Sequence, residues 1–162
     1  MHTPEQTPQE YFRLLLLTVV GTAFEAAGYH LIDSPMQWAG GLFTFSAALD
    51  NGLRGYIEFQ LLVYVEDQPS RFRVTLTRSD QPNPAMPSRH PAYARRDLSA
   101  LVVADFGVAI LPTARYWWQY RTVEELGRAL AEAGHLIVGF GLPWLTGSLT
   151  PPNVGQSSPS TT

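Results

Sequence analysis

Two carboxyl groups lie inside apolar stretches of the chain and are the residues best placed to do chemistry. Asp105 interrupts the apolar run from Leu98 to Leu111, and Glu58 lies in the long apolar segment from Leu53 to Glu66. A pair of carboxyl groups can divide general acid and general base work. A solvent-facing acid or an arginine partner is the simpler interpretation, because no other motif converges on either residue. We therefore expect no catalytic residue, and keep a small-molecule enzyme with an acid in a sheet/helix pocket as the third functional hypothesis.

Most other catalytic and metal chemistry is excluded by the residue types present. The 162 residues include no cysteine, and all 11 basic residues are arginine. The chain therefore has no thiolate ligand, cysteine nucleophile, Schiff-base lysine or P-loop lysine. No Gly-x-Ser-x-Gly or glycine-rich nucleotide motif occurs, and the four histidines lack metal-ligand spacing: His2, His30, His90 and His135. The sequence predicts neither a metal site nor a cofactor.

The basic charge is concentrated in one stretch of an acidic chain. Residues 71–96 contain six arginines and one acid, a net charge of +5, whereas the other residues carry −8 and the whole chain −3. Such asymmetry can mark an anionic partner, although a charge cluster is more often a solvated face. The expected strand register pairs Arg71 with Glu66 and Arg73 with Tyr64. The remaining arginines are the candidate binding residues: Arg78, Arg89, Arg95 and Arg96.

An aromatic run between two arginines is the second candidate binding element. Residues 115–121 read Arg-Tyr-Trp-Trp-Gln-Tyr-Arg. Aromatic and arginine side chains dominate interface hot spots and stack on bases. Alternation along an extended segment predicts that about half of these rings face the core and half the surface. The candidate contacts are Tyr116, Trp117, Trp118 and Tyr120.

Together the two elements indicate a domain that acts by binding. We expect a non-catalytic protein-interaction or accessory domain with a protein partner. The alternative is a contact to single-stranded nucleic acid, or to another anionic ligand, through residues 71–96 and the aromatic run. A pI of 5.7 argues against a dedicated nucleic-acid binder. The sequence is also compatible with a homo-oligomer.

Two helices are predicted from capping boxes. Thr7-Pro8-Gln9-Glu10 opens a helix from Pro8 to Ala27 that Gly28 ends. Its apolar middle should be covered on more than one side. The sequence Thr122-Val123-Glu124-Glu125 opens the second helix, whose apolar face comprises Leu126, Leu130, Ala133 and Ile137.

Alternating apolar residues predict the strands between these helices. They cover residues 29–32, 42–50, 53–66, 71–78 and 98–111, although the first half of the last could be a helical turn capped by Asp97. A proline-rich loop from Ser79 to Asp97 separates the last two strands.

The faces of the strands constrain the turns. A plain two-residue turn at Asn51-Gly52 would place Phe45 opposite Glu58, so we expect an odd-length loop or a bulge there. A four-residue loop over 67–70 gives a self-consistent register, with Val65 opposite Phe72, Val63 opposite Val74 and Leu61 opposite Leu76.

These elements predict an α+β fold, a two-layer sandwich of a four- to five-stranded antiparallel meander packed against an N-terminal and a C-terminal helix. The domain covers residues 8–147, after an N-terminal arm of residues 1–7 and before a disordered Ser/Thr/Pro tail of residues 148–162. The wet face of the sheet is a candidate recognition surface that carries Tyr56, Glu58, Gln60, Tyr64, Arg71 and Arg73.

Neither export nor membrane insertion is expected. The apolar run from Leu14 to Val20 is far shorter than the roughly 20 residues of a membrane span, and two acids precede it. Together with the lack of cysteine, this favours a cytoplasmic protein without membrane contact.

The motif Leu142-Pro143-Trp144-Leu145 follows the second helix, and Trp117-Trp118 precedes it. With the order of elements over residues 8 to 146, these residues resemble small bacterial α+β domains of unknown function whose last helix ends in a Pro-Trp-Leu motif. The resemblance implies the fold only, because those families have no assigned reaction.

Overall fold

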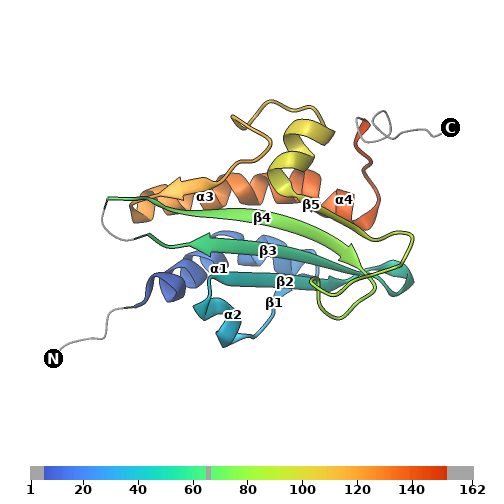
Figure 1. The fold of residues 1–162 in the computed structure, drawn as a ribbon, viewed down its shortest axis with the longest axis horizontal. Helices are drawn as coiled ribbons and strands as arrows, with labels where there is room; N and C mark the ends of the chain where they lie inside the picture. Colours follow the sequence, from blue (N-terminus) through green and yellow to red (C-terminus); the bar gives the residue numbers. More distant parts are fainter. Residues whose placement is uncertain (1–5, 65–66, 153–162) are drawn as a thin grey trace.

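The computed structural model describes residues 6–64 and 67–152 and has two layers (Figure 1). Its antiparallel sheet has the order β1-β2-β3-β4-β5, with β6 also paired to β4. The strands are β1 His30–Leu31, β2 Leu42–Ala48, β3 Arg54–Leu62, β4 Ser70–Ser79, β5 Ala94–Asp97 and β6 Trp118–Tyr120. The helices are α1 Pro8–Ala26, α2 Pro35–Ala39, α3 Val123–Leu136 and α4 Leu142–Thr146. The predicted α+β sandwich is confirmed.

Helices α1 and α3 cover one face of the sheet and build the core with it. Side chains of α1, including Phe12 and Phe24, are fully buried against Phe43 and Phe45 of β2. Phe12 and Phe43 have ring centroids 5.2 Å apart, and Phe24 meets Phe45 edge-on at 5.0 Å. The opposite face of the sheet carries neither helix, and we call it the open face (Figure 1).

The predicted start of each helix and the predicted end of the first are confirmed. Thr7 caps α1 through the expected reciprocal bonds with Glu10, and Gly28 has the left-handed φ of 88°. Thr122 caps α3, and all four residues of its predicted apolar face are buried. The chain then continues through a π-helical segment, Ile137–Gly141, into α4. The apolar pattern of the sequence did not predict the short helix α2.

The turn between β2 and β3 has the predicted odd length. Phe43 lies opposite Phe59 and Phe45 opposite Ile57, which brings the four apolar side chains to one face. Residues 49–53 form the connection, around a 3-10 turn in which Asn51 has a φ of 61°. The alternation of side chains was sufficient to exclude the two-residue loop.

The predicted register between β3 and β4 is wrong by four residues. Ile57, not Leu61, lies opposite Leu76, and Leu61 lies opposite Phe72. The connection runs from residue 63 to 69, longer than expected. Alternation fixes only which side chains share a face, and a shift by four residues leaves the faces unchanged. The predicted partners Val65 and Glu66 lie outside the described residues.

The predicted strand from Leu98 to Leu111 is also wrong. Its first half includes a π-helical segment, Ala100–Asp105, labelled η2 hereafter, in which Leu101 and Val102 are buried. The strand in this region is β5, which lies before it and within the predicted proline loop. The alternative prediction, a helical turn in the first half of this segment, is confirmed. A short apolar run does not distinguish a strand from a buried helical turn.

The termini of the predicted domain are described in part. Pro151, within the predicted tail, is buried. The rest of that tail, residues 153–162, and residues 1–5 of the predicted arm lie outside the described residues.

Candidate functional site

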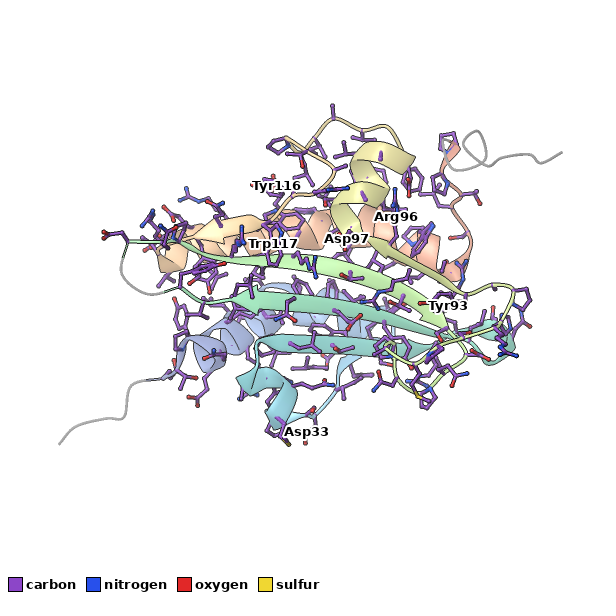
Figure 2. The ribbon with its side chains drawn as sticks, in the orientation of Figure 1. Asp33, Tyr93, Arg96, Asp97, Tyr116 and Trp117 are labelled. Carbon is purple, nitrogen blue, oxygen red and sulfur yellow. The ribbon has the colours of Figure 1, made fainter. Side chains whose placement is uncertain are left out.

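Strand β4 has two different partners along one edge, and this places the candidate site. Strand β5 pairs with Thr75 to Arg78, and β6 pairs with Ser70 to Phe72. Asp97 lies opposite Thr75, and Trp117 directly precedes the residue opposite Phe72, so these two residues lie close together where β4 changes partner (Figure 2). A hollow of about 340 Å³ lies between β5 and the segment before β6, and its lining includes Thr75, Asp97 and Arg115.

The end of the open face next to β5 is ion-paired. Arg95 Nη1 donates hydrogen bonds to Glu58 Oε1 and to Thr77 Oγ1, both at 3.1 Å. Thr75 Oγ1 donates to Asp97 Oδ1 at 3.1 Å. Burial raises the pKa of Glu58 above its ordinary value, against the opposing attraction of Arg95. We call Glu58, Thr75, Thr77, Arg95 and Asp97 the ion-paired end.

The end of the open face next to β6 carries arginines stacked on aromatic rings. The guanidinium carbons of Arg71 and Arg73 lie 4.7 and 5.0 Å from the ring centroid of Trp117. Arg71 Nη2 also donates to the Tyr64 hydroxyl at 3.2 Å. Within residues 6–64 and 67–152, no carboxylate forms an ion pair with either arginine. We call Arg71, Arg73, Trp117 and Tyr64 the Arg-Trp cluster.

The predicted pair of Arg73 with Tyr64 is wrong. Tyr64 is a partner of Arg71, whereas Arg73 stacks on Trp117 instead. The predicted pair of Arg71 with Glu66 falls on a residue outside the described part. Arg71 Nε is buried without a hydrogen-bond partner among the described residues.

Three of the four candidate arginines already have partners. Arg95 binds Glu58, and Arg96 makes two hydrogen bonds of 2.8 Å to Asp105, which raise the pKa of Arg96. Arg78 donates to backbone carbonyl oxygens of residues 92 and 144. A hollow of about 530 Å³ brings these three arginines together. Arg89 is exposed elsewhere in the loop, and its side chain forms no hydrogen bond or ion pair with a described residue.

The aromatic run alternates between the two faces, but three of its four rings pack against the core, more than the predicted half. Trp118 is 2% exposed, stacks on Phe72 at 5.5 Å and donates its Nε1 proton to Glu132, so it is a core residue rather than a surface contact. Tyr116 and Tyr120 pack against the same core, and burial raises the pKa of Tyr120 to about 12. Of the four candidates, Trp117 is the one in the Arg-Trp cluster.

Tyr56 does not belong to the exposed recognition surface that the sequence predicted. Its side chain is fully buried, and its hydroxyl donates a hydrogen bond to the carbonyl oxygen of Gln81. The proline-rich loop therefore covers this end of the open face. Glu58 is also largely buried.

The two candidate catalytic acids are held in separate ion pairs. Glu58 binds Arg95, whereas Asp105 accepts two hydrogen bonds from one edge of Arg96, from Nε and Nη2. A bidentate arginine occupies the carboxylate oxygens that a general acid or base would use. Among the described residues, no group of three or more His, Asp or Glu side chains could hold a metal ion.

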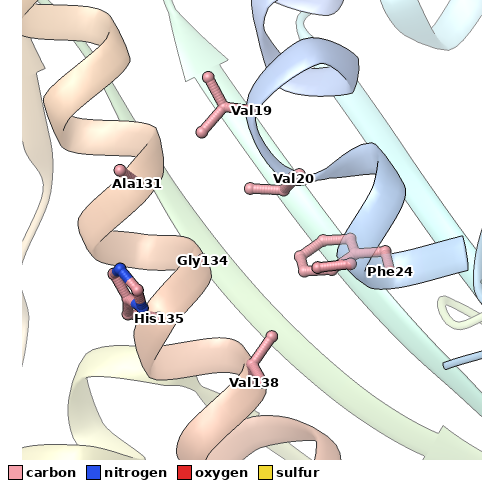
Figure 3. Close-up of a pocket in the computed structure, with 8 residues that line it drawn as sticks. Val19, Val20, Phe24, Ala131, Gly134, His135 and Val138 are labelled. Atoms are coloured by element: carbon pink, nitrogen blue, oxygen red, sulfur yellow. The ribbon is translucent and has the colours of Figure 1, made fainter. Parts of the chain in front are cut away.

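The helix layer has an apolar groove on its outer side (Figure 3). It lies between α1 and α3, has a volume of about 330 Å³ and is lined mainly by small apolar side chains, with His135 at its edge. Gly134 is required here, because a Cβ would lie 2.8 Å from a methyl group of Val20. Leu14 and Leu17 of α1 remain exposed, so the expected cover on further sides of this helix is only partial.

The fold and the site together define an α+β domain with one face open and arginines stacked on it. Comparison of the chain with protein-family models, curated proteins and solved structures finds no match. The resemblance to bacterial domains of unknown function therefore stays a prediction. No helix in the described ranges has the length and apolar character needed to cross a bilayer.

Proposed function

We propose that the chain is a non-catalytic binding domain that holds an acidic segment of a partner protein against the Arg-Trp cluster. The observation that carries this proposal is the pair of arginines, Arg71 and Arg73, that stack on Trp117 and form no ion pair within the described residues. Elsewhere on the sheet, Arg95 and Arg96 each have a carboxylate.

Stacking prepares these arginines to bind carboxylates. An arginine held over an indole ring can still present N–H groups at the edge of its guanidinium, and such an edge can make two parallel hydrogen bonds to a carboxylate. The cation–π contact also limits the side chain to few rotamers before binding, which reduces the entropy lost on association. Arg115 lines the adjacent hollow and extends the positive surface along the β4 edge.

The composition of the open face favours an acidic protein segment over single-stranded nucleic acid. Binding of single strands relies on several exposed rings that stack successive bases. Here Tyr56 and Trp118 are buried, and both arginines of the cluster lie over the Trp117 ring.

Fluorescence anisotropy with two labelled peptides tests the proposal. One peptide alternates glutamate and serine, and the matched control has glutamine in place of glutamate. Low ionic strength is needed, because the Debye length is only about 10 Å in 0.1 M salt. We expect the glutamate peptide alone to bind, and Arg73→Gln to weaken it about tenfold, as for loss of a charge-assisted hydrogen bond.

Arg89→Gln is the matched control, because it removes the same charge from an exposed position outside the cluster. It should change the affinity less than about twofold. Equal losses in the two variants would show a diffuse charge effect and contradict the proposed site. Tighter binding of an oligothymidine than of the peptide, lost in Trp117→Ala, would replace it with the nucleic-acid alternative.

A further inference from the structure

The hollow that brings Arg78, Arg95 and Arg96 together is separate from the Arg-Trp cluster. Its volume is about 530 Å³, within the usual range for small-molecule sites. Arg78 lies on the same side of β4 as the core residues Val74 and Leu76, whereas the Arg-Trp cluster is on the open face. The lining combines charged and apolar groups: Arg78, Arg96, Asp105, Trp144, Leu149 and Pro151.

Arg78 is held in place by neutral groups. Its Nε donates to the carbonyl oxygen of Ala92 at 2.7 Å, and its Nη1 donates to that of Trp144 at 2.9 Å. The guanidinium carbon also lies 5.6 Å from the centroid of the Trp144 ring. These contacts fix the guanidinium without neutralising it, and burial lowers its pKa.

The other charges at the hollow cancel. Asp105 neutralises Arg96 through two hydrogen bonds of 2.8 Å, and Arg95 is paired with Glu58. In the described residues, Arg78 therefore has no carboxylate partner, and its Nη2 makes no hydrogen bond. The hollow has an excess of one positive charge.

We propose that this hollow binds a small organic monoanion, a carboxylate attached to an apolar body. A single negative charge matches the excess at Arg78, and a planar carboxylate matches the donor geometry of a guanidinium. The ring of Trp144 and the side chains of Leu149 and Pro151 supply apolar surface for the rest of the ligand. This inference does not depend on the proposed protein partner.

Benzoate is a suitable probe, and benzamide is its neutral match in shape. Both can be titrated into the full chain by calorimetry. We expect benzoate to bind with a dissociation constant on the order of 1 mM, typical of so few atoms, and benzamide to bind at least about tenfold more weakly.

Leu149 offers a variant that changes the charge of the hollow without disturbing the core. It is 37% exposed and lies in the segment that follows α4. Leu149→Glu places a competing carboxylate in the hollow and should weaken benzoate at least about tenfold, whereas Leu149→Gln, its neutral match, should retain more of the affinity. Arg78→Lys keeps the charge but loses the planar donor group, and should also weaken binding.

Four results would overturn the inference. The first is equal affinity for benzoate and benzamide, and the second is equal affinity of Leu149→Glu and Leu149→Gln for benzoate. The third is loss of benzoate binding in Arg73→Gln. The fourth is no detectable binding at a benzoate concentration roughly a hundred times the expected dissociation constant. The third would move the anion to the Arg-Trp cluster. An unchanged affinity of Arg73→Gln for benzoate supports a site separate from the Arg-Trp cluster. The peptide experiment then tests the cluster independently of benzoate binding.

Discussion

At one end of the open face, Arg95 reaches across β4 to a carboxylate that is largely buried. At the other end, Arg71 and Arg73 lie on a tryptophan, and no carboxylate in the described residues meets them. The arginines at both ends come from the same basic stretch of sequence, yet their chemical states differ. In the ion-paired end a carboxylate of the same chain meets the positive charge, whereas in the Arg-Trp cluster no described carboxylate does.

The largest difference in stability between the two faces of the sheet is expected for substitutions of the adjacent Trp117 and Trp118. Trp118→Ala removes a core side chain and should lower the free energy of unfolding by about 3 to 5 kcal/mol. Trp117→Ala removes a half-buried ring from the open face and should cost about 1 kcal/mol or less. Urea unfolding of both variants measures this difference. Similar losses in the two would mean that Trp117 is also a structural residue.

Within the open face, removal of an arginine should affect stability only in the ion-paired end. Arg95→Gln leaves the buried Glu58 carboxylate without its ion-pair partner and should cost about 1 kcal/mol at neutral pH, a modest value because the Arg95 side chain is 44% exposed. Arg73→Gln should cost less than about 0.5 kcal/mol. If the order of these two losses in urea unfolding is reversed, the comparison between the two ends fails.

A smaller effect is expected in the pH dependence of stability. Burial raises the pKa of Glu58 above its ordinary value of 4.5, so the folded chain binds this proton more tightly than the unfolded chain. The corresponding stabilisation is full below the unfolded pKa and is lost as the pH rises through the folded pKa.

Unfolding at a series of pH values checks this sign. Glu58→Gln should remove the part of the pH dependence of stability that comes from titration of Glu58. Arg95→Gln should extend it to higher pH, since Arg95 is the main group that lowers the pKa of Glu58, whereas Arg73→Gln should change it little, since Arg73 is the weakest of these groups. A curve for Glu58→Gln that coincides with the unmodified chain would contradict the account.

Features that depend on alternation were predictable from the sequence. The odd turn between β2 and β3 and the division of Trp117 and Trp118 between the faces both follow from which side chains share a face. The two caps follow from local side-chain chemistry.

The sequence could not predict which arginines form ion pairs and which stack on a ring, because this depends on pairing between strands that are distant in the chain. Arg95 meets Glu58 only because β5 pairs with β4 next to Thr77. The sequence did not predict β5, because the apolar run that suggested a strand begins only at Leu98. The register of β3 and β4 admitted an even shift, which changed the neighbours of Arg73. As a result, Arg78, Arg95 and Arg96 were expected to be free, and the cluster at Arg71 and Arg73 was missed.

NMR observation of the arginine side chains tests the central claim most directly. Since the chain has 11 arginines and no lysine, Nε–H signals report every arginine and lysine charge of the protein. During titration with the glutamate peptide, we predict that the signals of Arg71 and Arg73 shift, while those of Arg78, Arg95 and Arg96 stay in place. Shifts confined to Arg95 and Arg96, with Arg71 and Arg73 unchanged, would contradict the assignment of the binding surface to the Arg-Trp cluster.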